Sequence, residues 1–262
     1  MREIAWQILA LTMASPVLVR ADTAVAIWTG AQVTVAADSR RAITRNGKIF
    51  DTETTCKLRS VGDLVIATSG LVGHEEDDLL AAIRDGSANN GDSISAATLG
   101  PVESVRTYLE RIMTLRERFS GTHLYESVLN VSALIAGLSP DGKPLLGRIH
   151  VLPGPPESQV DGSSTDFTFS VASYPGAREG HGSDPKRAIE IIGVTNAISR
   201  FKARSPKWDA GPDVEVGMRL VDLEARDPAS SPYVGGSVSS LRIDRTGIHW
   251  IQKGVCRWEP SK

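Results

Sequence analysis

The stretch ADTAVAIWTGAQVTVAADSR, residues 21–40, contains the residues with the clearest chemical potential. It follows a short apolar leader, and removal of that leader would create a new N-terminus at Asp22 or Thr23. A threonine at a chain start carries a hydroxyl nucleophile, and its own α-amino group is a base that can take the hydroxyl proton. The pKa of a free α-amino group is about 7.7–8.0, so a fraction of it is neutral near pH 7. An aspartate cannot do this, so the position of the cut decides the chemistry.

The leader, residues 1–21, has the features of a secretory signal peptide. Arg2 gives a positive start, residues 8–14 form an apolar core, and Val19 and Ala21 occupy the −3 and −1 positions. These features predict cleavage after Ala21, export to the periplasm or medium, and Asp22 as the first mature residue. The alternatives are a cleaved propeptide, in which case the protein is cytoplasmic, or a buried first helix. No later apolar run reaches the roughly 20 residues of a spanning helix, which predicts no membrane span after cleavage.

Strand alternation indicates where Thr23 points. In a strand, Thr23 shares a face with Val25 and Ile27, while Asp22 shares the other face with two alanines. The bulky face is expected to be the core side, and the small face to leave room for a cleft. The pattern therefore predicts that Thr23 points into the core.

The elements expected along the chain alternate in blocks of strands and helices, which favours an α+β class with antiparallel sheets. Hairpins are expected around TGA and around SPDGK, the latter with Asp-Gly at its centre. The expected strands are 23–28, 32–37, 63–70, the two runs beside SPDGK, 167–173, 237–244 and 248–254. The expected helices are 74–86, 101–119, 185–201 and 213–226.

Several segments in order resemble proteasome subunits and their bacterial relatives among the N-terminal-nucleophile (Ntn) hydrolases. They are TAVAIWTGAQVTVAADSR, TCKL, LVIATSGLVG, LIAGLSPDGKPLLGRIHVLPG and YVGGSVSSLRIDRTGIHWI. The resemblance implies a four-layer αββα sandwich of two stacked antiparallel sheets, formed by a single domain over residues 22–262. It also implies assembly into a homo-oligomer through the helix layers.

The resemblance also implies a set of catalytic residues: Thr23, Asp38, Lys57 and Gly70. Thr23 would be the nucleophile, Lys57 would favour its neutral amine, and Asp38 would hold Lys57 in place. Gly70 would supply a backbone N–H for the oxyanion. This chemistry acts on peptides or small amides and needs no metal or organic cofactor.

The chain departs from the family pattern at the nucleophile. In catalytic members the nucleophile precedes the acid of the second strand by sixteen residues, and 38 − 16 = 22 is Asp22. TAVAI also resembles the TAVGI of non-catalytic α-type subunits, and the auxiliary Ser-Gly segment is not recognisable. Two functions follow as alternatives. One is a threonine-type peptidase or amidohydrolase, in which a cut between Asp22 and Thr23 frees the Thr23 amine. The other is an inactive binding or assembly module.

The composition and the remaining motifs argue against nucleic-acid binding and against a zinc site. A formal net charge of −2, with 41% hydrophobic residues, gives no basic excess for nucleic acid. Cys56 and Cys256 either form one disulfide that ties the C-terminal tail to the body, or remain separate thiols. No CxxC or His pair has zinc-ligand spacing. Among the five histidines, His181 in EGHGSD has the most unusual, glycine-rich setting.

Overall fold

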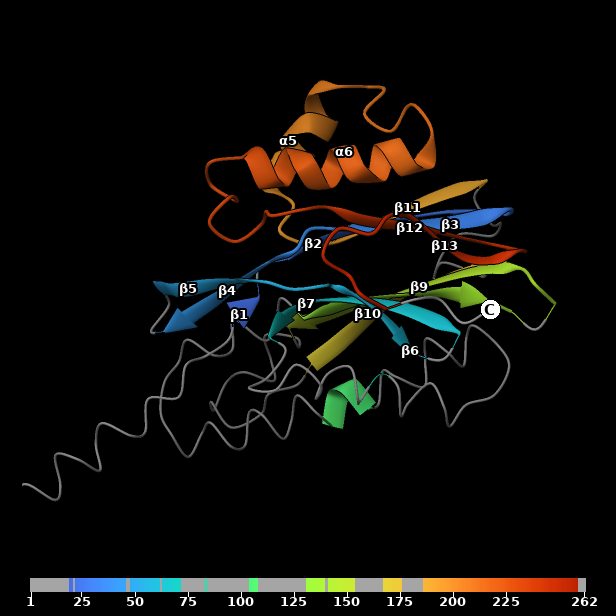
Figure 1. Ribbon diagram of the computed structural model, residues 1–262, viewed down its shortest axis with the longest axis horizontal. Helices are drawn as coiled ribbons and strands as arrows, with labels where there is room; N and C mark the ends of the chain where they lie inside the picture. The colour runs from blue at the N-terminus through green and yellow to red at the C-terminus, as the bar shows by residue number, and fades with distance from the viewer. Residues whose placement is uncertain are drawn as a thin grey trace, which may run out of the picture.

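The strands form two large antiparallel sheets and one separate hairpin (Figure 1). The computed structural model describes residues 19–20, 22–45, 48–61, 63–71, 83, 104–107, 131–139, 141–153, 167–175 and 186–258. The strands are β1 Val19–Arg20, β2 Thr23–Thr29, β3 Gln32–Ala37, β4 Arg40–Arg45, β5 Lys48–Thr54, β6 Leu58–Val61, β7 Leu64–Leu71, β8 Ser132–Leu138, β9 Pro144–Pro153, β10 Phe167–Tyr174, β11 Arg187–Gly193, β12 Ser239–Asp244 and β13 Gly247–Gln252. The α+β class with antiparallel sheets is therefore confirmed.

The first sheet has five strands in the order β11-β2-β3-β12-β13. The predicted hairpin of β2 and β3 lies near its centre, and the Thr29 side chain closes the turn by accepting a bond from Gln32 N at 3.2 Å. Both faces of this hairpin are buried. Val25 and Ile27 pack on the helix side, whereas Ala24 and Ala26 lie in the core between the two sheets. The shared face of Val25 and Ile27 agrees with the sequence, but the alanine face is filled by the core and is not open.

The second sheet follows the order β1-β7-β8-β9-β10, with β6 also paired to β7. The hairpin of β8 and β9 turns at SPDGK as predicted, and Gly142 in this turn has a φ of +73°. The inward side chains of these strands meet those of the first sheet in one apolar core. From the second sheet this core includes Leu58, Val65, Ala67, Leu134, Ala136, Leu146, Ala172 and Tyr174.

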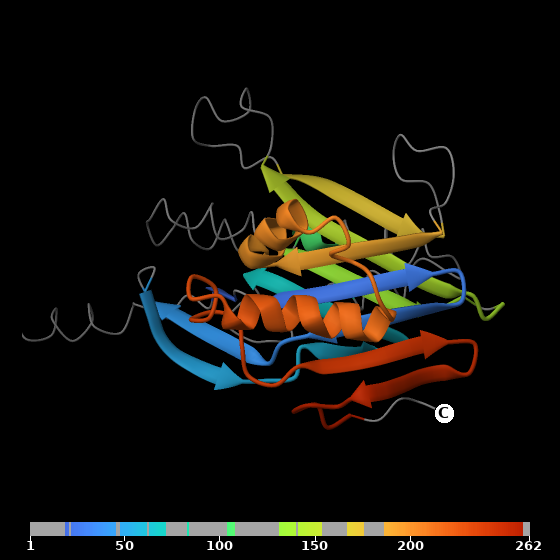
Figure 2. The same cartoon turned by 90° about the horizontal axis from the view of Figure 1, so that it is seen from above.

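Helices α5 (Asn196–Arg204) and α6 (Asp213–Arg226) cover the outer face of the five-stranded sheet, as Figures 1 and 2 show. The prediction of α6 was correct at both ends. Its apolar stripe, including Val216, Leu220 and Val221, packs on Val25 and Ile27. This packing fixes which face of β2 is turned toward the helices.

The helix predicted over 185–201 was wrong in its first half. Residues 187–193 form β11, and α5 begins only at Asn196. The segment RAIEIIG alternates between partly buried and buried side chains, and it pairs along its whole length with β2. Asp184-Pro185 is a local helix-start signal, but the isoleucine-rich alternation and the free edge of β2 favour a strand.

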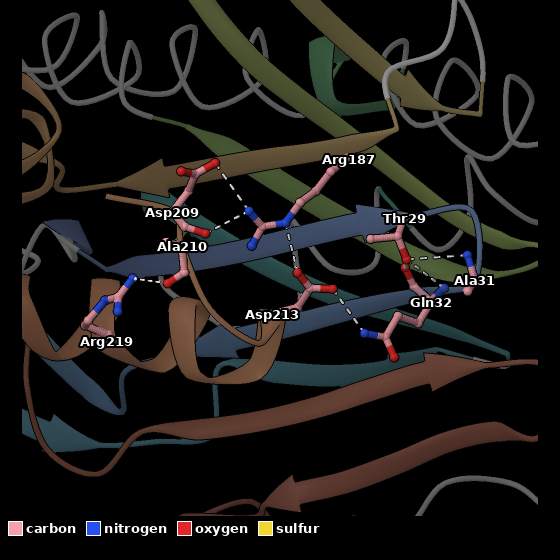
Figure 3. A network of polar contacts seen from close by, with 8 residues as sticks. All are labelled: Thr29, Ala31, Gln32, Arg187, Asp209, Ala210, Asp213 and Arg219. Carbon is pink, nitrogen blue, oxygen red and sulfur yellow. Dashed lines mark hydrogen bonds and ion pairs between the residues drawn. The ribbon is translucent and has the colours of Figure 1, made fainter. Parts of the chain in front are cut away.

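A network of polar side chains fixes the start of α6 to the sheet (Figure 3). Arg187 of β11 binds Asp213 Oδ1 at 2.9 Å through Nε, and its Nη1 donates to the Asp209 carbonyl at 2.8 Å. Gln32 Nε2 donates to the second Asp213 oxygen at 3.1 Å. Asp213 therefore joins β11 and β3, the strands on either side of β2, to the first turn of the helix.

The far side of the six-stranded sheet carries helical residues 104–107, seen below it in Figure 1. Val105 is buried there, and the Arg106 guanidinium lies 4.9 Å from the centre of the Phe169 ring of β10. The rest of the helices predicted over 74–86 and 101–119 falls outside the described residues, apart from Ile83, which is helical and buried. Among the described residues, no helix is long and apolar enough to cross a membrane.

The C-terminal tail crosses from the five-stranded sheet to the six-stranded one and is linked there by a Cys56–Cys256 disulfide. Cys256 is buried in the core between the sheets. The Trp258 indole donates to the Leu58 carbonyl at 2.6 Å, and its ring lies 4.7 Å from that of Trp250. The sequence left the pairing of the two cysteines open, and the structure contains the bridge.

Candidate functional site

Three charged side chains meet at the N-terminal end of β2 and are shielded from solvent. The Lys57 ammonium lies 2.6 Å from Asp22 Oδ1 and 2.7 Å from Asp38 Oδ1, and all three side chains are at most 1% exposed. Asp22 immediately precedes β2, Asp38 immediately follows β3, and Lys57 immediately precedes β6. We call Asp22, Asp38 and Lys57 the charge cluster.

Asp38 is the best-supported member of the charge cluster. Its Oδ1 accepts bonds from Lys57 Nζ and from Thr23 N, the latter at 3.0 Å. Its Oδ2 accepts from Arg40 N at 3.1 Å and from Gly235 N at 2.9 Å. The side chain thus ties the start of β2, the start of β4 and the loop before β12 to one another.

The charge balance of the cluster is negative when both carboxyl groups are ionised, because one ammonium faces two carboxylates. Burial raises the pKa of Asp38 above its ordinary value; the Lys57 charge acts against this and the Asp22 charge adds to it. Asp22 Oδ2 is buried and accepts no hydrogen bond from the residues that the structure describes. The protein interior therefore favours a proton on Asp38.

This pKa shift predicts a pH dependence of stability. A carboxyl group whose pKa is higher in the folded state than its unfolded value of about 3.9 contributes stability that is lost as pH rises through the folded pKa. Asp22→Asn removes the neighbouring charge, so the variant is expected to lose less stability over that window than the wild type. Urea unfolding of both proteins from pH 4 to pH 8 measures this. A difference in unfolding free energy that stays constant with pH would contradict the prediction.

Thr23, the predicted nucleophile, is buried, and its hydroxyl points away from the charge cluster. Thr23 Oγ1 donates to the Val194 carbonyl at 2.8 Å, just beyond the end of β11. Thr23 contacts Asp38 through its backbone: Thr23 N donates to Asp38 Oδ1 at 3.0 Å, and the Thr23 carbonyl accepts from Asp38 N at 3.3 Å. The Lys57 ammonium contacts the residue one position earlier, Asp22, which is the position that the sixteen-residue spacing indicates.

Gly193 allows the end of β11 to lie directly against the backbone of Asp22. Its φ is +87°, and a Cβ placed on it would lie 1.7 Å from the Asp22 carbonyl oxygen and 2.8 Å from Ser69 Oγ. Gly193 is opposite Thr23 in the pairing of β11 and β2, and Val194 N donates to the Asp22 carbonyl at 2.8 Å. The backbone of β11 can approach Asp22 only because this position has no side chain.

Gly193→Ala is expected to destabilise the protein. A strained backbone conformation alone costs about 1–3 kcal/mol, and the loss should exceed this because a steric clash adds to the strain. Gly30→Ala is the matched control, since a Cβ at Gly30 meets nothing within 4 Å. Chemical denaturation of both variants tests this. Equal, small losses in the two would show that the backbone near Asp22 has more room than the structure indicates.

Gly70, the predicted oxyanion donor, lies in β7 with a φ of +97° and is buried. It pairs with Arg20 of β1, and the preceding residue, Ser69, approaches Gly193. The structure therefore places Gly70 one residue from the wall of the site. It brings Asp38, Lys57 and the Thr23 backbone together directly.

Sequence reasoning did not identify Gly193, Val194 and Gly235 as parts of the site. Gly193 follows an isoleucine-rich run and Gly235 belongs to YVGGS, so glycines at the ends of apolar runs were the available signal. In the described part of the chain, no group of three or more His, Cys, Asp or Glu side chains has the arrangement of a metal site. His181 lies outside the described residues.

Comparisons with known proteins identify the fold. No family model matches the chain, and no curated protein matches it. Solved structures of Anbu (ancestral beta-subunit) proteins do match. That from Yersinia bercovieri has a TM-score of 0.53 at 16% identity, and covers 88% of this chain and 87% of its own. A Gly-1 mutant from Hyphomicrobium sp. strain MC1 gives 0.51 at 15%, covering 88% and 87%. The helical assembly from Pseudomonas aeruginosa gives 0.50 at 19%, covering 85% and 81%.

These comparisons correct the assignment made from the sequence. The short motifs indicated a proteasome subunit of the Ntn hydrolases, yet no family model bears this out, and the similar structures are Anbu proteins. The motifs that carried the assignment are mostly strand and turn sequences, which many antiparallel sheets share. At 15–19% identity the likeness concerns the fold alone. The chain has a fold similar to that of the Anbu proteins.

Proposed function

We propose that this chain is an exported, self-associating protein that uses an Anbu-like fold for binding or assembly, without threonine-based catalysis. One observation carries the proposal: Lys57 binds the carboxylates of Asp22 and Asp38, whereas the Thr23 hydroxyl donates to the Val194 carbonyl. Lys57, the lysine that would tune a threonine nucleophile, is thus paired with two aspartates and not with Thr23.

Asp22 is a poor substitute for a threonine at this position. Its carboxylate oxygen lies 2.6 Å from an ammonium, which stabilises its negative charge and lowers its reactivity as a nucleophile. An ionised carboxylate also has no hydroxyl proton for an α-amino group to remove. The residue serves to bind Lys57.

Two features support export with cleavage after Ala21. The cut would create an α-ammonium on the buried Asp22, and this added positive charge would balance the second carboxylate of the charge cluster. The Cys56–Cys256 disulfide is typical of an oxidising compartment. The same cut would remove β1, which pairs with Gly70 and Leu71 of β7.

A second candidate function is a threonine-type peptidase or amidohydrolase acting on peptides or small amides. It is favoured by the bond of 3.0 Å between Thr23 N and Asp38 Oδ1, because a cut after Asp22 would leave the freed Thr23 amine next to this carboxylate. The Thr23 hydroxyl would then have to leave Val194 and turn toward Lys57.

The test identifies the N-terminus of the exported protein and then measures its reactivity. The full chain is expressed with its own leader, recovered from the exported fraction, and analysed by intact mass and N-terminal sequencing. It is then incubated with a peptide epoxyketone, which reacts with both the hydroxyl and the amine of an N-terminal threonine. We expect a chain that begins at Asp22 and gains no mass.

A chain that begins at Thr23 and gains one epoxyketone would overturn the proposal in favour of the hydrolase. Thr23→Ala should then abolish the mass gain, and Thr68→Ala, at another buried threonine, should retain it. A chain that begins at Met1 in the cytoplasmic fraction would remove the export part of the proposal.

Self-association is supported by the Anbu structure from Pseudomonas aeruginosa, which is described as a helical assembly. The Anbu-like fold also leads us to propose the complete four-layer αββα sandwich. Sedimentation velocity of the exported protein is expected to show a species larger than the 28.1 kDa chain. A single monomeric species over a hundredfold concentration range would contradict this.

A further inference from the structure

A row of four polar side chains crosses the six-stranded sheet on its inner face. Ser69 of β7 is opposite Ser132 of β8, Ser132 is opposite His150 of β9, and His150 is opposite Ser170 of β10. Strand alternation puts them on the side of Ala67, Leu134, Leu146 and Ala172, which belong to the core between the sheets. We call Ser69, Ser132, His150 and Ser170 the serine–histidine row.

Two members of this row form a close pair. Ser132 Oγ lies 2.5 Å from His150 Nδ1, so the hydroxyl and the ring nitrogen share one short hydrogen bond. Burial lowers the pKa of His150, and the Arg148 charge on the same strand lowers it further. The lowered pKa favours the neutral imidazole near pH 7. In the tautomer that carries its proton on Nε2, Nδ1 accepts the Ser132 hydrogen bond and can take its proton.

The neighbours of the pair are occupied by other contacts. Arg148 makes an ion pair with Glu190 of β11 through Nε at 2.9 Å, and its Nη2 donates to Ser170 Oγ at 3.2 Å. Glu190 also accepts from the Tyr174 hydroxyl at 2.7 Å. These bonds fix the arginine and Ser170, and leave Ser132 as the hydroxyl that His150 can activate.

Exposure rises along the row toward β10. Ser69 and Ser132 are 1% and 2% exposed, whereas His150 and Ser170 are partly exposed. A small molecule would therefore approach Ser132 from the His150 side. At the other end, Ser69 lies next to Gly193 and the Asp22 carbonyl, so the row begins beside the charge cluster.

We propose that Ser132 is a nucleophile activated by His150, and that the pair transfers acyl groups from small activated esters. Ser132 Oγ attacks the ester carbonyl and forms a new C–O bond, while its proton moves to His150 Nδ1. The alcohol leaves as its C–O bond breaks and takes that proton. Water then attacks the acyl-serine, His150 accepts the water proton and returns it to Ser132, and the carboxylic acid is released. A nucleophile and base within hydrogen-bond reach are the minimum set for this chemistry. The site is independent of Thr23 and goes beyond the proposed function.

The test uses a small alkyl fluorophosphonate on the full chain. Ser132 Oγ would form a bond to phosphorus, fluoride would leave, and the proton would pass to His150. We expect intact mass to show one added phosphonyl group, and peptide mapping to place it on Ser132. Loss of a general base typically costs about 10²–10⁴ in rate, so His150→Asn, which keeps a polar atom near Nδ1, should label at least about a hundredfold more slowly.

Ser170→Ala is the matched control, because it removes the hydroxyl on the other side of His150 and should leave labelling at Ser132 in place. Thermal melting of each variant checks that it is folded. Wild-type protein that gains no mass under conditions that label a known serine hydrolase would overturn the proposal. Labelling of His150→Asn at the wild-type rate would overturn it too. Neither outcome bears on the epoxyketone experiment, which reports on Thr23 alone.

Discussion

Lys57→Met is expected to lower the free energy of unfolding by about 3–5 kcal/mol, the usual cost of removing one partner from a buried ion pair. The Lys57 ammonium lies within 2.7 Å of an oxygen of both Asp22 and Asp38, with all three side chains almost fully shielded from solvent. Without it, the two buried carboxylates lose the ammonium that contacts both of them. Asp38 would keep only its three bonds from backbone N–H groups, those of Thr23, Arg40 and Gly235.

Lys143→Met is the matched control. Lys143 also lies close to an aspartate, 2.5 Å from Asp141 Oδ2, but both side chains are more than half exposed. Solvent screens such a pair, so this variant should unfold close to the wild-type midpoint. Urea denaturation of the two variants measures the difference. Adding Asp22→Asn to Lys57→Met should recover part of the lost stability. Equal stability of Lys57→Met and Lys143→Met would contradict the interpretation of the charge cluster.

The double substitution Cys56→Ser with Cys256→Ser is expected to cost up to about 5 kcal/mol, from the chain-entropy relation for a loop of 200 residues. The bridge joins the tail after β13 to the segment that carries Lys57. The local consequence should be visible first near Trp250 and Trp258, whose rings lie 4.7 Å apart at the bridge end of the tail.

Two measurements check this. Thermal melting gives the global loss, and tryptophan emission should shift to the red as the Trp258 bond to Leu58 is released. Reduction of the wild-type protein should reproduce the behaviour of the double variant. A variant with an unchanged melting temperature would show that the bridge adds no stability to the folded chain.

The sequence predicted the elements whose formation depends on residues that are close together in the chain. The hairpins at TGA and SPDGK and helix α6 follow from turn residues and from apolar periods of two and 3.6, which are local properties. The segment 187–193 was mispredicted because its helix-start signal is local, whereas its partner β2 lies more than 150 residues earlier. The hairpin of β4 and β5 was missed, since its polar strands lack a clear apolar alternation.

For the site, the spacing along one hairpin determined a great deal. A tight turn between β2 and β3 sets their register, with Ala24 opposite Ala37, so the start of β2 lies beside Asp38. Strand alternation then directs Asp22 and Thr23 to opposite faces. Only the tertiary structure decided that Lys57 binds both carboxylates, that Cys56 meets Cys256, and that Ser132 meets His150. The physical reason is that these contacts join segments brought together by sheet pairing and core packing, and side-chain periodicity along a single strand carries no information about such partners.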